Sequence, residues 1–126
     1  MRYSAYSYFT RWEVLIPEAI HEWSNSLDTS EYEHYIAALE ELRDKGPNLK
    51  RPLVGKIEGS KYKNMKELIP MSGNFRILFV FDPKRKAVLL VAGDKTNNWE
   101  KWYKKNIPIA EQNYETYLKQ IGERNG

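Results

Sequence analysis

The amino-acid sequence predicts an α+β fold, in which a small antiparallel β-sheet carries two N-terminal helices and further C-terminal helices packed against one of its faces. Three observations favour this class. Residues 17–47 show the apolar spacing and the end signals of helices. Residues 53–91 form short β-prone runs separated by turn residues. Residues 97–121 return to a helical pattern, so helices and strands are segregated along the chain, as in α+β domains.

The N-terminal part is expected to contain one strand and two helices. Residues 11–16 form a short apolar run and are expected to be a strand. Residues 18–27 place apolar side chains at helical spacing directly after a proline, a residue that often opens a helix. The second helix begins with a capping-box pattern at Ser30 and Glu33 and ends at the Gly-Pro pair of residues 46–47.

The middle of the chain is expected to supply the sheet. Its apolar runs are short and are separated by Gly, Ser, Asn and Pro, the residues that form turns. The candidate strands are residues 53–57, 61–69, 75–82 and 88–91. Because the connections between consecutive strands are short, the strands are expected to pair as an antiparallel meander. The face of the sheet without helices is then either wet or occupied by a ligand.

The C-terminal part is expected to hold two helices, over residues 97–105 and 109–121, interrupted by the proline between them. Trp99 and Trp102 lie on one side of the first helix, a spacing that is typical of core packing. Just before this helix, Gly93 is expected to let the chain leave the sheet sharply.

Length and composition indicate one domain over residues 1–126. The chain contains no cysteine, which excludes disulfides and cysteine-based metal sites. Its longest apolar runs, residues 77–81 and 87–92, have the length of strands and are too short to span a membrane. The first residues lack the apolar segment of a secretory signal. We therefore expect a cytoplasmic protein without membrane association.

Charge is distributed unevenly along the chain. Residues 1–47 carry 9 acidic and 4 basic side chains, whereas residues 48–126 carry 8 acidic and 16 basic ones. The net charge is only +3, but the basic half predicts a polyanion partner bound by one face. The alternative is that these charges only solvate the surface.

The basic side chains best placed to form such a face lie at strand ends and turns. They are Lys56, Lys61, Lys63, Lys66, Arg76 and Lys95. Lys63 and Lys66 have opposite parity on a regular strand, so they share a face only if the strand contains a bulge. Arg76 lies within an apolar run, where it either faces solvent or serves the site. The rim of the face, which attracts phosphates, is expected to carry Lys101, Lys104 and Lys105.

The sequence offers few groups for chemistry. Its two histidines, His21 and His34, lie on predicted helices, and no spacing of ligand residues indicates a metal site. Lys, Arg and Tyr remain, and these can cleave RNA without a metal or cofactor. The 2′-hydroxyl attacks the adjacent phosphate while a base takes its proton, cations stabilise the charge, and an acid protonates the leaving oxygen. A lysine crowded by other cations has a lowered pKa and can act as the base or the acid.

Several sequence blocks occur in an order that characterises one protein family. They are Gly46-Pro47, Arg51-Pro52-Leu53, Gly59-Ser60, Asn64-Met65-Lys66-Glu67-Leu68, Arg76-Ile77-Leu78-Phe79, Asp82-Pro83, Gly93-Asp94-Lys95, and Trp99 with Trp102-Tyr103. From about residue 12 to residue 118, the chain closely resembles the HigB-like, phage-derived branch of the RelE/ParE toxin superfamily. One position departs from the family pattern. Where the motif commonly reads Glu-Leu-Arg, this sequence has Glu67-Leu68-Ile69.

The resemblance implies a RelE-like toxin of a type II toxin–antitoxin system, neutralised by a helix-turn-helix, HigA-like antitoxin. It also implies inhibition of translation by ribosome-dependent cleavage of mRNA, without a metal or cofactor. It places a phosphate-binding role on Arg76 and a general-base or charge-stabilising role on Lys95 or Lys66. It implicates Tyr103 in base stacking or proton transfer. Lys63 or Lys66 would replace the charge of the missing arginine, although a lysine lacks the bidentate fork.

Two other interpretations stay open. The superfamily includes gyrase poisons on the same fold, so the second interpretation is a non-enzymatic toxin that binds a protein target such as DNA gyrase. In that case Trp99 or Trp102 would act as an aromatic anchor. The third interpretation is a binding module without toxicity, which the missing arginine keeps open.

Overall fold

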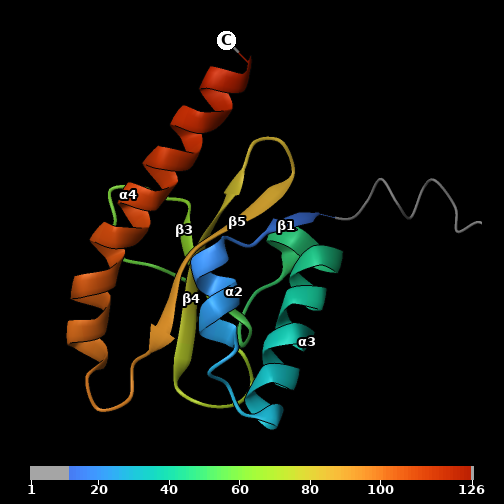
Figure 1. Ribbon diagram of the computed structural model, residues 1–126, viewed down its shortest axis with the longest axis vertical. Helices are drawn as coiled ribbons and strands as arrows, with labels where there is room; N and C mark the ends of the chain where they lie inside the picture. Colours follow the sequence, from blue (N-terminus) through green and yellow to red (C-terminus); the bar gives the residue numbers. More distant parts are fainter. Residues whose placement is uncertain (1–11, 126) are drawn as a thin grey trace, which may run out of the picture.

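The computed structural model describes residues 12–125, which form a five-stranded sheet and three α-helices (Figure 1). The helices are α2 (Glu18–Ser24), α3 (Thr29–Lys45) and α4 (Trp99–Asn125), with a short 3₁₀-helix η1 (Gly46–Asn48) after α3. The strands are β1 (Glu13–Leu15), β2 (Val54–Lys56), β3 (Met65–Leu68), β4 (Phe75–Asp82) and β5 (Lys86–Asp94). The predicted α+β class is confirmed, and every predicted strand is present. Residue 11 of the predicted first strand lies outside the described residues.

The sheet is mixed rather than purely antiparallel. Its strand order is β1-β5-β4-β3-β2. Strands β2 to β5 pair antiparallel with their neighbours, which confirms the meander. Strand β1 instead pairs parallel with β5, with Val14 opposite Ala87, so this part of the prediction is wrong. Two helices connect β1 to the rest of the sheet, and a long connection allows the parallel direction that a hairpin forbids.

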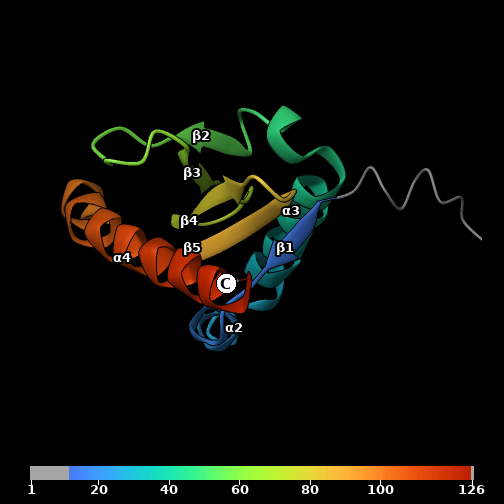
Figure 2. The same ribbon diagram turned by 90° about the horizontal axis from the view of Figure 1, so that it is seen from above.

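Helices cover both faces of the sheet. Alternate residues of a strand point to opposite sides, and in β4 both sets are buried. Ile77 and Phe79 pack in the core formed with α2 and α3, whereas Leu78 and Val80 pack in the core formed with α4. Figures 1 and 2 show α3 and α4 on opposite sides of the sheet. The prediction that the helices share one face is therefore wrong, because a strand buried on both faces has no polar alternation to reveal it.

Helix α3 begins earlier than predicted. Asp28 is its N-cap: the Asp28 side chain accepts a hydrogen bond from the N–H of Glu31, and the Glu31 carboxylate accepts one from the N–H of Asp28. The capping box therefore joins Asp28 and Glu31, and the predicted pair Ser30 and Glu33 is wrong. Both pairs have the required spacing, but the carboxylate of the N-cap gains additional stabilisation from the helix dipole.

Helix α4 is continuous, so the predicted interruption near Pro108 is wrong. A proline inside a helix lacks the N–H that would complete one hydrogen bond. Pro108 lies on the exposed side of α4, whereas Ile107, Ala110 and Tyr114 are buried against the sheet. The burial of this apolar stripe offsets the missing bond. The C-terminal turns of α4 project beyond the sheet (Figure 1).

The beginning of α4 lies close to β5. Gly93 is inside β5 and has no positive φ, so the expectation that it lets the chain leave the sheet is wrong. A Cβ atom on Gly93 would lie 2.6 Å from Nε1 of Trp102. The glycine is needed because the indole of Trp102 packs directly on the strand backbone. Trp102 thus packs in the core, as predicted.

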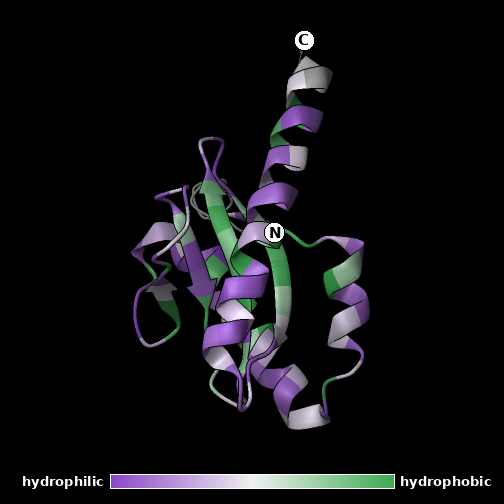
Figure 3. Cartoon of the chain, turned by 90° about the vertical axis from the view of Figure 1, so that its left-hand side faces the viewer, coloured by the Kyte–Doolittle hydropathy of each residue, from purple (hydrophilic) through white to green (hydrophobic). Residues whose placement is uncertain are grey.

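Apolar residues concentrate on the strands, while the helices are hydrophilic over much of their surface (Figure 3). Strand β4 contributes to both cores, and its Phe75, Ile77, Leu78, Phe79 and Val80 are all buried. Within residues 12–125, none of the helices combines the length and the apolar character that crossing a membrane requires.

Candidate functional site

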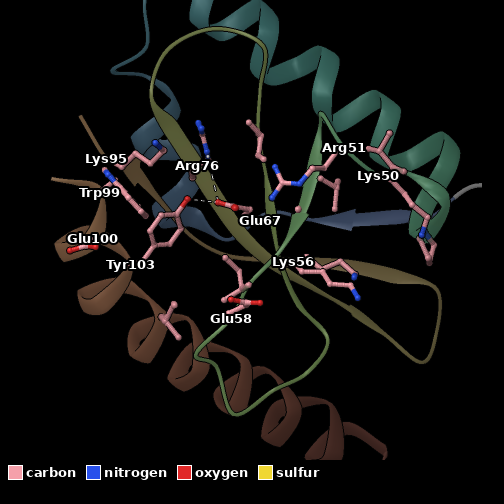
Figure 4. A pocket seen from close by; sticks show the side chains of 18 residues that line it. Lys50, Arg51, Lys56, Glu58, Glu67, Arg76, Lys95, Trp99, Glu100 and Tyr103 are labelled. Carbon is pink, nitrogen blue, oxygen red and sulfur yellow. Dashed lines mark hydrogen bonds and ion pairs between the residues drawn. The ribbon is translucent and has the colours of Figure 1, made fainter. Parts of the chain in front are cut away.

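A cleft of about 1010 Å³ lies between β2 and β3 on one side and the first turns of α4 on the other. One end of the cleft, here termed the aromatic end, contains Arg76, Lys95, Trp99 and Tyr103. The other, termed the lysine end, contains Lys50, Lys56 and Lys66. In Figure 4, Arg51 and Glu67 lie between the labelled residues of the two ends. Basic side chains outnumber acidic ones in this lining, which suits an anionic ligand.

Glu67 holds the aromatic end together. It is 8 % exposed, and its Oε1 atom accepts a hydrogen bond of 2.5 Å from the hydroxyl of Tyr103. The same oxygen lies 3.8 Å from Nε of Arg76, whose Nη1 donates to the carbonyl of Phe75 at 2.8 Å. Arg76 thus faces the α4 side of the sheet and is oriented by its own strand and by β3. A buried carboxylate is stable only with such partners.

The phenol of Tyr103 is held in its neutral form. Burial, followed by the hydrogen bond to Glu67, raises the pKa of Tyr103 well above its usual value. Arg76 acts in the opposite direction but does not outweigh these two causes. At neutral pH the Tyr103 hydroxyl is therefore a hydrogen-bond donor, and it donates to Glu67.

The lysine end crowds three ammonium groups together. Lys56 and Lys66 are opposite one another in the β2–β3 register. Burial, and then the charges of Lys56 and Lys50, lower the pKa of Lys66. A lysine with a lowered pKa has a larger neutral fraction, which is the form that accepts a proton.

Arg51, which the sequence indicates only as part of a family block, contributes a second guanidinium to the cleft. A Cβ atom on Gly55 would lie 3.0 Å from Nη2 of Arg51 and 3.4 Å from Oε2 of Glu67. The absence of a side chain at Gly55 therefore lets Arg51 lie over the strand next to the carboxylate. Ile69, which stands where the family motif commonly has an arginine, lines the same cleft. Arg51 therefore provides the cleft with a guanidinium that position 69 does not. Glu67 was also missed, because only the fold reveals its partners on β4 and α4.

The predicted site residues separate into two groups. Arg76, Lys95, Lys66, Tyr103 and Lys56 line the cleft, as does Trp99. The remaining candidates, Lys61, Lys63, Lys101, Lys104 and Lys105, do not line it and are exposed elsewhere on the surface.

Lys61 is the clearest case of a candidate placed elsewhere. Its ammonium group pairs with Glu115 of α4 at 2.7 Å, and its backbone N–H donates to Glu111 at 2.8 Å. These contacts attach the loop between β2 and β3 to α4. Lys63 lies in the turn before β3 rather than on the strand, so the question of its parity with Lys66 does not arise.

The site offers six cations, a phenol, the buried carboxylate of Glu67 and the exposed carboxylates of Glu58 and Glu100 as its chemical groups. In the part of the chain that the structure describes, no three His, Cys, Asp or Glu side chains are placed together to hold a metal ion. Guanidinium and ammonium groups bind phosphate oxygens and stabilise charge on a phosphorus centre. The arrangement therefore fits a phosphodiester.

Comparison with known proteins gives the family. The family model "Phage derived protein Gp49-like (DUF891)" matches residues 22–115. The chain is similar to "Putative toxin HigB3" of Mycobacterium tuberculosis, with 44 % identity over 105 residues that cover 83 % of this chain and 91 % of that protein. It is also similar to "Putative toxin HigB2" of the same organism, with 45 % identity over 107 residues, 82 % of this chain and 53 % of that protein.

Solved structures show the same fold at low sequence identity. One is the archaeal RelE-RelB complex from Pyrococcus horikoshii OT3, with a TM-score of 0.54 and 17 % identity, covering 68 % of this chain and 97 % of that chain. Another is a mutant of E. coli toxin RelE in the free state, with a TM-score of 0.53 and 13 % identity, covering 88 % of this chain and 98 % of that chain. Together with the family match, this confirms the resemblance found in the sequence, and the chain belongs to the phage-derived Gp49-like family of RelE/HigB-like toxins.

Proposed function

We propose that this protein is the toxin of a type II toxin–antitoxin system and inhibits translation by cutting mRNA on the ribosome. The observation that carries the proposal is the cleft, which combines two guanidinium groups, four lysines and a neutral phenol. The 44 % identity between this chain and "Putative toxin HigB3" supports the same conclusion. We place the protein in the cytoplasm, where mRNA is translated.

The proposed reaction transfers the phosphoryl group from the 5′-oxygen of one nucleotide to the 2′-oxygen of the nucleotide before it. Lys66 takes the proton from the 2′-hydroxyl, and its lowered pKa enlarges the fraction of neutral amine that can do so. The 2′-oxygen then bonds to phosphorus while the bond to the 5′-oxygen breaks, leaving a 2′,3′-cyclic phosphate and a 5′-hydroxyl. Lys95 supplies the proton to the leaving oxygen.

The guanidinium groups stabilise the charge that develops on the phosphate. Arg76 is oriented by the Phe75 carbonyl and by Glu67 before the substrate arrives, so little reorganisation is required. The guanidinium of Arg51 lies over Gly55, near the Glu67 carboxylate. Arg51 supplies a bidentate group to the cleft, which the isoleucine at position 69 does not. Tyr103 acts through Glu67, which it holds in position. Metal ions and cofactors take no part in this proposal.

The proposed partner is a helix-turn-helix, HigA-like antitoxin that neutralises the toxin by binding it. A solved structure of the same fold is a RelE-RelB complex, and the family resemblance supports a corresponding antitoxin here. The proposed target is the ribosome with its mRNA.

Pulse labelling after induction of the protein alone tests this function. Incorporation of labelled amino acids should fall before incorporation of labelled thymidine. Arg76→Ala and Lys95→Ala should remove the effect, while Lys105→Ala, an exposed lysine away from the cleft, should keep it. An initial fall in DNA synthesis would instead indicate a protein target such as DNA gyrase. Full arrest by Arg76→Ala and Lys95→Ala would show that the site is wrongly assigned.

A further inference from the structure

Trp99 is exposed in a way that core packing does not explain. It is 57 % exposed, although its spacing with Trp102 predicts burial, and that prediction is wrong for Trp99. The other three tryptophans, Trp12, Trp23 and Trp102, are all more covered. Large aromatic side chains normally bury most of their surface. An exposed indole on the wall of a cleft is therefore available to a ligand.

A row of aromatic rings fixes the position of Trp99. The indole of Trp102 lies on the backbone of Gly93. Tyr103 packs edge-on against Trp102, with ring centroids 5.2 Å apart, and its hydroxyl is bonded to Glu67. Trp99 packs edge-on against Tyr103, with ring centroids 6.2 Å apart and planes at 81°. Trp99 is the exposed end of a row anchored in the sheet, and its edge contact with Tyr103 restricts the orientations of its ring.

Tyr103, which the family resemblance implicates in base stacking, is less exposed than Trp99. Its ring lies between two indoles and its hydroxyl is engaged by a buried carboxylate. Trp99 is the exposed ring of the row. Lys95 and Arg76 line the same end of the cleft, as does the exposed carboxylate of Glu100. A ligand bound there would meet an indole and two cations, with one carboxylate at the edge.

We propose that Trp99 stacks on an unpaired nucleobase of the RNA whose phosphate is bound by Arg76 and Lys95. This inference rests on the proposed function and deepens it. An aromatic platform beside cations is the arrangement that binds single-stranded nucleic acid, because each nucleotide presents a flat base next to a charged phosphate. Stacking is tolerant of base identity, since all four bases have an aromatic face. The base that stacks is the one beside the phosphate in the cleft.

Binding of a fluorescein-labelled single-stranded RNA with 2′-O-methyl groups, which prevent cleavage, tests the proposal. Trp99→Ala should weaken binding by about 5- to 150-fold, the range measured for the loss of one stacked base, and Trp99→Phe should restore most of it. Tyr32→Ala removes an exposed aromatic side chain outside the cleft and should leave binding unchanged. Denaturant midpoints of the Trp99 variants should match the wild type, because the side chain is exposed.

Two further readouts separate stacking from a general loss of affinity. An RNA with one abasic nucleotide at the stacked position should weaken the wild type but have no further effect on Trp99→Ala. In a plot of the logarithm of the binding constant against the logarithm of the salt concentration, Arg76→Ala should reduce the slope by about one unit. Trp99→Ala should leave this slope unchanged. If the free RNA does not bind, the same variants and the same abasic substitution are compared by cleavage rate on programmed ribosomes.

The outcomes distinguish this inference from the proposed function. Wild-type binding or cleavage that Trp99→Ala leaves intact would overturn the stacking role and leave the nuclease function standing. Growth arrest by the wild type without any RNA cleavage would overturn both. If Trp99→Ala also abolished that arrest, the indole would be the anchor for a protein partner.

Discussion

The hydrogen bond between Tyr103 and Glu67 gives the most quantitative prediction. Tyr103→Phe removes the hydroxyl that donates to Glu67 at 2.5 Å and keeps the ring that packs between Trp99 and Trp102. Glu67 is 8 % exposed, so water does not easily replace the lost donor. Its ion pair with Nε of Arg76 spans 3.8 Å. A hydrogen bond to a charged group contributes about 1.5–3 kcal/mol, so the free energy of unfolding should fall by about that amount.

This loss should be visible in both chemical and thermal unfolding. For 126 residues the unfolding entropy near the midpoint is about 0.26 kcal/mol/K, so the midpoint temperature should fall by about 6–11 °C. Urea unfolding should show a lower midpoint with an unchanged m-value. Tyr32→Phe, at an exposed aromatic residue of α3, is the matched control and should change neither.

A double-mutant cycle with Glu67→Gln identifies the cause of the loss. If the two side chains act through their bond, the double variant should lose clearly less stability than the sum of the single losses, with a coupling energy of about 1–3 kcal/mol. A loss below about 0.5 kcal/mol for Tyr103→Phe, together with no coupling, would refute the reasoning. The aromatic end would then not be held by Glu67.

Three further predictions concern packing and protonation. Gly93→Ala should lower the free energy of unfolding by about 1–3 kcal/mol and shift the fluorescence of Trp102, because the new methyl group would lie 2.6 Å from the indole; unchanged urea midpoint and spectrum would contradict this packing. Lys66→Met should raise the urea midpoint at pH 7 while abolishing RNA cleavage, because its lowered pKa means that the fold disfavours the charged amine; a fall in both would contradict the site. The raised pKa of Tyr103 keeps its proton in the folded state when the unfolded chain releases it above about pH 10. The free energy of unfolding should therefore fall as the pH rises above about 10, and it should fall less steeply for Tyr103→Phe than for the wild type. Equal dependence on pH in the two proteins would contradict the raised pKa of Tyr103.

The parts of the fold that sequence predicts well are those governed by local chemistry. Strand β4 was predicted with its observed bounds, because residues 75–82 are strongly β-prone and end at an Asp-Pro pair. The end of α3 was also predicted, since glycine and proline follow it directly. Among the site residues, Arg76 was singled out because a charge within an apolar run is unusual.

The errors arise where tertiary packing outweighs a local signal. Pro108 lies inside α4 because the buried stripe around it stabilises the helix on the sheet. Apolar periodicity marks a residue as buried but does not say which helix covers it, so the two-faced core went unrecognised. Trp99 has the same spacing signal as Trp102, but only Trp102 reaches the sheet.

The residues missed at the site share one property, which is dependence on distant partners. Glu67 reads as an ordinary strand glutamate until Tyr103, 36 residues later, is placed beside it. Arg51 reads as an exposed loop residue until Gly55 leaves room for its guanidinium next to that carboxylate. Conversely, Lys61 has the charge expected of an RNA-binding residue, but Glu115 of α4 engages it away from the cleft.

The most direct test of the proposed nuclease is a map of new 5′ ends after the protein is produced alone in cells. The map compares translated and untranslated copies of one mRNA, with Arg76→Ala as the site variant and Lys105→Ala as the control. We expect cuts only in the translated copy, lost in Arg76→Ala and kept in Lys105→Ala. Growth arrest without cuts in either copy would contradict the proposed function and point to a protein target.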